Sequence, residues 1–143
     1  MKLPEYITKE EVSRVCNLLG IQDWTKLAKS EVPLEEAKII QRIVGGEAIQ
    51  ISTEAFKLGL EIELEHGIIF PDANVTNNHP ILTGKIVLAH LKEMLDYYIR
   101  LEVAELEGDL RKAFENKSSE KMFSYYEKLI DAKLILIKDE ANQ

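Results

Sequence analysis

The chain has 143 residues, which is a common size for a single domain. Twenty-five Asp and Glu residues outnumber eighteen Lys and Arg residues, and the resulting net charge of −7 repels nucleic-acid phosphates and anionic lipid surfaces. We therefore expect neither nucleic acid nor a membrane as a partner, and the 45% of hydrophobic residues is enough for a packed core.

The sequence contains one cysteine, Cys16, so it has no partner for an internal disulfide. The first residues lack the apolar run of a secretory signal, and no stretch reaches the ~18 consecutive apolar residues of a membrane span. We therefore expect a cytoplasmic protein. Cys16 lies in an apolar helical pattern with Val12, Val15 and Leu19, which favours a buried core residue over a reactive thiol.

Two short helices are expected in the first third of the chain. A capping box, with threonine three residues before glutamate, predicts a helix over residues 8–19, and Gly20 ends it in the left-handed conformation. A proline followed by two glutamates predicts the start of a second helix, whose buried face extends to residue 44 before Gly45 ends it. These two helix-turn units occupy residues 8–50.

The rest of the chain predicts three longer helices. A helix over residues 53–66 is followed by a loop over residues 68–80, where turn-forming residues are frequent and His79 is expected to be a solvated turn residue. Apolar residues at helical spacing then predict the longest helix over residues 83–107. The last helix is predicted over residues 118–138.

The predicted fold is all-α, because no segment shows the sustained alternation of a half-buried strand. Residues 1–143 are expected to form a single-domain bundle of about five helices. The long helix and the final helix are expected to form an antiparallel pair in that bundle.

Two pairs of polar residues are the best candidates for a site. Glu63 and His66, and likewise His90 and Glu93, are three residues apart on predicted helices, so each pair projects from one helix face. If the two helices pack antiparallel, the four side chains could form a Glu2His2 shell suited to zinc, iron or manganese. Tyr97, one turn beyond Glu93, could add a phenol.

Other interpretations of the same residues stay open. Glu-x-x-His pairs are common on the surface of Glu-rich helical proteins, where they make structural hydrogen bonds and bind no metal. The sequence also does not decide whether the protein is an enzyme. The alternative function is a non-enzymatic interaction module, in which the apolar face of Phe123, Tyr126 and Ile130 binds a second copy or a partner helix.

Residues 55–102 carry a run of motifs that resembles a small uncharacterised prokaryotic family, known only as a domain of unknown function. The motifs are Glu63-Leu64-Glu65-His66-Gly67, Asn74-Val75-Thr76, Leu82-Thr83-Gly84-Lys85-Ile86, Ala89-His90-Leu91, Glu93, Asp96-Tyr97-Tyr98 and Arg100-Leu101.

They define a signature region over residues 53–107. The resemblance brings no established activity. It implies that one set of residues belongs to a single local arrangement, either a binding site or a tightly packed core: His66, Gly67, Thr83, Gly84, Lys85, His90 and Tyr97.

Overall fold

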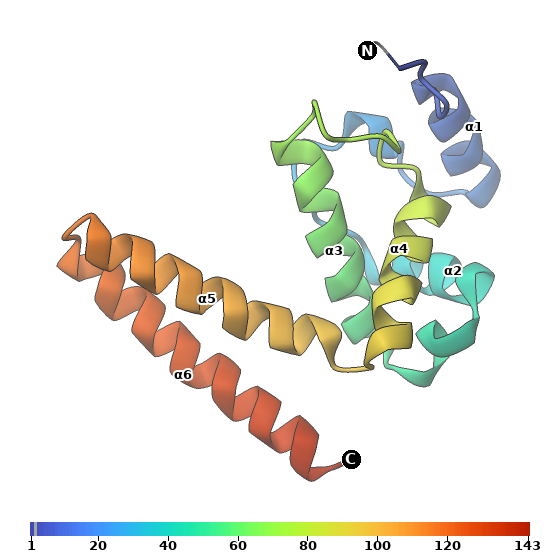
Figure 1. Ribbon diagram of the computed structural model, residues 1–143. Coiled ribbons are helices and arrows are strands. Elements are labelled where there is room, and N and C mark those ends of the chain that lie inside the picture. Colours follow the sequence, from blue (N-terminus) through green and yellow to red (C-terminus); the bar gives the residue numbers. More distant parts are fainter. Residues whose placement is uncertain (2) are drawn as a thin grey trace. The chain divides into compact units, whose positions relative to one another are not determined.

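The computed structural model describes Met1 and residues 3–143. All regular structure in these residues is helical, with no strand, which confirms the predicted fold class. Six α-helices and two short 3-10 helices follow one another along the chain (Figure 1). They are α1 (Lys9–Leu19), η1 (Trp24–Lys26), α2 (Leu34–Val44), η2 (Gly46–Gln50), α3 (Thr53–Ile69), α4 (Pro80–Glu93), α5 (Tyr97–Glu115) and α6 (Ser119–Ala141).

The described part of the chain divides into two compact units, Met1–Leu95 and Asp96–Gln143. The first unit contains α1 to α4, and the second contains α5 and α6. A single bundle that includes all the helices stays a prediction. Within the described residues, no helix is both long enough and apolar enough to cross a membrane.

The expected count of about five helices is wrong, because the predicted long helix over residues 83–107 is two helices. Met94 has extended backbone angles, φ −160° and ψ 138°, and ends α4. Asp96 precedes α5 and forms an ion pair of 2.7 Å with Arg100, one turn into that helix. Neither glycine nor proline marks the break, and the helical spacing of apolar residues continues across it. The sequence therefore gives no signal that the helix ends there.

Local signals at the ends of α1 and α2 match the structure, whereas α4 begins at Pro80 and α5 ends at Glu115, beyond both ends of the predicted helix over residues 83–107. The Thr8 side chain accepts a hydrogen bond from the Glu11 amide, and Gly20 ends α1 in the left-handed conformation with φ 67°. The Ser52 hydroxyl caps α3 in the same way. Helix α3 continues to Ile69, however, so the predicted end at residue 66 is wrong by one turn.

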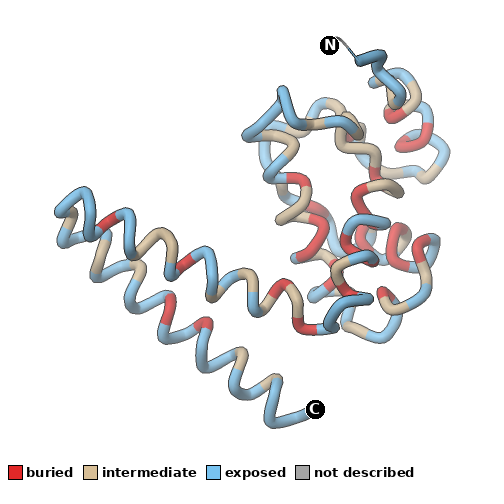
Figure 2. The backbone as a smooth tube through the Cα atoms, viewed as in Figure 1, coloured by how far each residue is buried: buried red, intermediate tan, exposed pale blue. Residues whose placement is uncertain are grey.

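The core of the first unit lies where α2, α3 and α4 pack together (Figure 2). Gly84 of α4 lies at this crossing: a Cβ there would come within 2.8 Å of the methyl groups of Ile40 and Val44, so only glycine allows α2 and α4 to approach so closely. The fully buried side chains of this unit include Trp24, Ile40, Phe56, Leu60, Leu64, Val87 and Leu91.

Two polar interactions fix the first half of this unit. Trp24 donates its indole N–H to Glu36 at 3.1 Å and is fully buried, so the only tryptophan is tied to α2. Cys16 is also fully buried, as the sequence predicts, and burial raises the pKa of its thiol. Gln41, only 6% exposed, donates its amide to the Ala48 carbonyl at 2.8 Å and thereby holds η2 against α2.

The second unit is a hairpin in which α5 and α6 run antiparallel and pack along their length (Figure 1). Its central cluster consists of Leu106, Leu129 and Ala132, with Val103, Leu110 and Tyr125 partly buried around it. Much of α6 is exposed, in contrast to α2, α3 and α4 (Figure 2).

Candidate functional site

The loop between α3 and α4 is held to the end of α3 by asparagine side chains. Asn74 donates its amide to the Gly67 carbonyl at 3.1 Å and to the Asn78 side-chain oxygen at 2.8 Å. Asn77 and Asn78 adopt φ values of 49° and 62°, a left-handed conformation that asparagine tolerates better than most residues. The loop therefore has a defined conformation built on Asn74.

Gly67 is the helix residue on which this loop rests. A Cβ at this position would overlap the Asn78 side-chain oxygen and lie 2.9 Å from the amide nitrogen of Asn74. Real Cβ atoms do not approach other heavy atoms so closely. Glycine at position 67 thus allows the two asparagine side chains to meet over the last turns of α3.

The loop, α3 and the start of α4 line a half-open cavity of about 170 Å³. Its polar lining includes the Glu63 carboxylate, the His66 imidazole and the Asn74 amide, and all its lining residues lie in the first unit. The complete lining is Glu63, His66, Gly67, Phe70, Ala73, Asn74, Val75, Thr76, Asn78, Thr83 and Ile86.

Glu63 lies between two imidazoles from two helices. One carboxylate oxygen is 3.4 Å from Nε2 of His90 on α4, and the other is 4.0 Å from Nδ1 of His66 on α3. The Glu63 side chain is only 14% exposed, whereas His90 is 31% and His66 is 54% exposed. The structure therefore brings three of the four predicted ligands together around one largely buried carboxylate.

The remaining candidate residues are placed differently. Glu93 is exposed and does not line the cavity. Thr83 lines it but donates its hydroxyl to the His79 carbonyl, and Lys85 lies 3.5 Å from the Val44 carbonyl at the end of α2. Tyr97 belongs to the second unit, where its ring lies edge-on against Tyr98 with centroids 5.1 Å apart.

The residues that the structure describes contain no group of three or more His, Cys, Asp and Glu placed to hold a metal ion. The zinc, iron or manganese site therefore stays a prediction. The contacts of Glu63 with the two imidazoles are in its favour, but the full set of Glu63, His66, His90 and Glu93 is not gathered around one point.

His79 differs from the sequence-based expectation of a solvated turn residue. It is half-buried, and its Nδ1 accepts hydrogen bonds from the amides of Ile81 and Leu82, so it caps α4 at the N-terminus. Burial is the main cause that lowers the pKa of His79 below its usual value. The proline that follows it was a usable signal, because proline is favoured in the first turn of a helix.

Sequence reasoning also missed the loop asparagines and the apolar walls of the cavity. Asn74 belonged to a quoted motif and Asn78 was visible as a turn former, but neither bond of Asn74, to the Gly67 carbonyl and to the Asn78 side chain, could be foreseen, because both depend on the path of the loop. Phe70 and Ile86 line the cavity, but nothing in the sequence indicates that these two residues lie near each other.

A family model described as a protein of unknown function, DUF5661, matches residues 12–107, more than half of the chain. The chain belongs to this family. The DUF5661 match includes every residue that lines the cavity and ends within α5, so α6 lies outside it. Neither a curated protein nor a solved structure matches the chain.

Proposed function

We propose that this DUF5661 protein binds a small polar molecule in the cavity beside Glu63. The observation that carries the proposal is the position of the Glu63 carboxylate, which lines the cavity and is also approached by His66 and His90. A largely buried carboxylate is costly unless hydrogen bonds or charges stabilise it. The proposal concerns binding and assigns no reaction.

The size and lining of the cavity restrict the ligand. A volume of about 170 Å³ is close to that of engineered apolar cavities that hold a benzene ring, so we expect a ligand of roughly six to eight non-hydrogen atoms. Phe70, Val75 and Ile86 provide apolar walls, whereas Glu63 and Asn74 provide polar contacts. A short amine or guanidine fits this chemistry, and the net charge of −7 favours a cation.

A divalent metal ion is the second candidate. It is favoured by the approach of two imidazole nitrogens to the two oxygens of one carboxylate, because imidazole and carboxylate are common ligands of zinc, iron and manganese. An ion at this position would need His66 to move closer to Glu63, since metal–ligand distances are about 2.0–2.2 Å.

Isothermal titration calorimetry tests the proposal with three probes: methylguanidine, n-propylamine and zinc chloride. We expect one of the organic cations to bind the wild-type chain, and Glu63→Gln to weaken that binding at least about tenfold, because the charge is lost while the shape is kept. Glu65→Gln is the matched control, since Glu65 is exposed on the same helix and does not line the cavity.

The outcomes separate the two candidates. A metal site in place of the organic ligand would be identified by two results together. The wild-type chain binds zinc but neither organic cation, and the His66→Ala, His90→Ala double variant no longer binds zinc. If none of the three probes binds at millimolar concentration, or if Glu65→Gln affects binding as strongly as Glu63→Gln, the proposed function is wrong.

A further inference from the structure

Helix α6 carries two apolar faces, of which only one packs against α5. The inner face includes Leu129 and Ala132, which are buried in the hairpin core. A second apolar face, the outer stripe, is offset by one residue from the inner face, and its members are 43–73% exposed. The outer stripe consists of Phe123, Tyr126, Ile130, Leu134 and Ile137.

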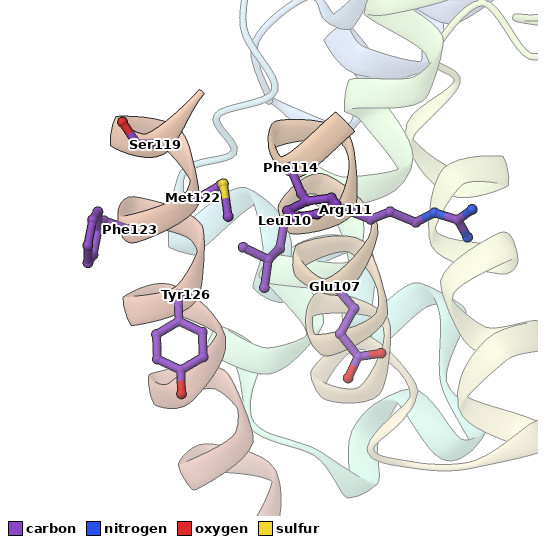
Figure 3. A pocket seen from close by; sticks show the side chains of 8 residues that line it. All are labelled: Glu107, Leu110, Arg111, Phe114, Ser119, Met122, Phe123 and Tyr126. Carbon is purple, nitrogen blue, oxygen red and sulfur yellow. The ribbon is translucent and has the colours of Figure 1, made fainter. Parts of the chain in front are cut away.

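The outer stripe is continuous with a groove at the closed end of the hairpin (Figure 3). The groove has a volume of about 520 Å³, and Phe123 and Tyr126 belong both to it and to the stripe. In Figure 3, Leu110 and Met122 point toward each other between the helices, whereas Phe123 points away from α5. Phe114 of α5, 67% exposed, lines the same groove.

The spacing of the outer stripe is symmetric about Ile130. Tyr126 and Leu134 lie four residues on either side of it, and Phe123 and Ile137 lie seven residues on either side. At 3.6 residues per turn, all five side chains project within about 40° of the direction of Ile130. Antiparallel pairing about a twofold axis at Ile130 therefore places each apolar residue of the stripe opposite an apolar residue of the second copy, which makes the surface self-complementary.

The charges beside the stripe act in both directions on antiparallel pairing. Glu120 and Lys138 lie on one flank, ten residues before and eight residues after Ile130. A twofold axis at Ile130 places Glu120 of one copy about 3 Å along the helix axis from Lys138 of the other. Glu127 and Asp131 lie nearer the axis on the same flank and weaken the pairing, so the apolar contacts supply most of its free energy.

The exposed apolar area is close to that of a stable dimer. With about 200 Å² for each large side chain, the outer stripe exposes roughly 560 Å² per copy, or about 1,100 Å² for a pair, and Phe114 beside it raises the total to about 1,400 Å². Stable protein interfaces bury about 1,200–2,000 Å². A small helical unit with so short a central cluster as Leu106, Leu129 and Ala132 also gains stability from a second copy.

We propose that the outer stripe of α6 forms the contact surface of an antiparallel homodimer, in which Ile130 meets Ile130 of the second copy and Tyr126 meets its Leu134. The pairing of two hairpins forms a four-helix assembly. This proposal does not depend on the cavity beside Glu63, because every residue that it uses lies in the second unit.

Sedimentation equilibrium of the full chain tests the proposal, with Ile130→Lys as the disrupting variant. Ile130 is exposed, so lysine there leaves the fold of the monomer intact, which far-UV circular dichroism checks. In the dimer it places two charges at the centre of an apolar contact, so we expect the dissociation constant to rise about 100-fold or more. Ile135→Lys is the matched control, because Ile135 is 56% exposed but points away from the stripe, and we expect it to leave the dissociation constant unchanged.

Cysteine cross-linking tests the orientation. Under mild oxidation, Ile130→Cys should give a covalent dimer, whereas Phe123→Cys should not, because antiparallel pairing separates the two copies of that residue by about 21 Å. Cross-linking of both variants would show parallel helices and overturn the proposal. A wild-type chain that stays monomeric at high concentration would also overturn it, even if its stripe binds a helix of another protein. A dimer that Ile135→Lys weakens as much as Ile130→Lys would overturn it too.

Discussion

Replacement of Gly67 by alanine tests how the cavity loop is built. In an unobstructed helix, Gly→Ala stabilises by about 0.5–1 kcal/mol, because alanine loses less backbone entropy on folding. At position 67 the new methyl group would displace Asn78 and Asn74 and break the two hydrogen bonds that Asn74 donates. Each such bond contributes about 0.5–1.5 kcal/mol.

The loss of these bonds outweighs the gain in helix propensity, so we expect Gly67→Ala to destabilise the first unit by about 1 kcal/mol. Gly108→Ala is the matched control: Gly108 is also helical, but a Cβ there would have no heavy atom within 4 Å, so we expect stabilisation of the second unit by about 0.5–1 kcal/mol. The two substitutions are chemically identical and are predicted to have opposite signs.

The measurement is thermal unfolding, followed by fluorescence and by far-UV circular dichroism. Trp24 is fully buried in the first unit and is the only tryptophan, so its fluorescence reports on that unit. A loss of 1 kcal/mol in a unit of this size lowers the midpoint by about 4–8 °C. An unchanged or higher fluorescence midpoint in Gly67→Ala would show that the loop adjusts without cost and that the packing argument is wrong.

Two further predictions concern buried polar groups in the first unit. Gln41→Leu should lower the free energy of unfolding in urea by about 2–3 kcal/mol, because the Ala48 carbonyl and the Thr53 hydroxyl would lose their hydrogen-bond partner. A loss below about 0.5 kcal/mol would contradict this role of Gln41. His79 has a pKa below its unfolded value, so the stability that it contributes is fully present above about pH 6.5 and is lost as the pH falls through the lowered pKa. His79→Asn, which keeps a capping side chain, should make the midpoint less sensitive to pH between pH 7 and pH 5, and an unchanged pH profile would contradict the capping role.

The candidate site was predictable only in part. The three-residue spacing places Glu63 and His66 on one face of a helix, so that pair follows from helix geometry alone. The arrival of His90 beside Glu63 required α3 and α4 to pack together, which the sequence suggested but did not determine. Glu93, in contrast, is exposed in the structure, because it is the last residue of α4 before the chain turns.

Local chemistry in the sequence was enough to determine the helical class and the ends of the first two helices. Capping hydroxyls, glycine in the left-handed conformation and apolar spacing act within a few residues, so they can be recognised without knowledge of the fold. Thr8 and Gly20 are examples where the predicted cap is the observed one.

Tertiary structure decided the features that depend on residues far apart in the chain. The break between α4 and α5 has no glycine or proline to mark it, and the apolar spacing runs across it. Asn74 holds the cavity loop to α3 by its hydrogen bond to the Gly67 carbonyl, and Glu63 meets His90 because α3 and α4 pack together. These contacts depend on how the chain packs in three dimensions, and local sequence preferences carry no direct record of that packing.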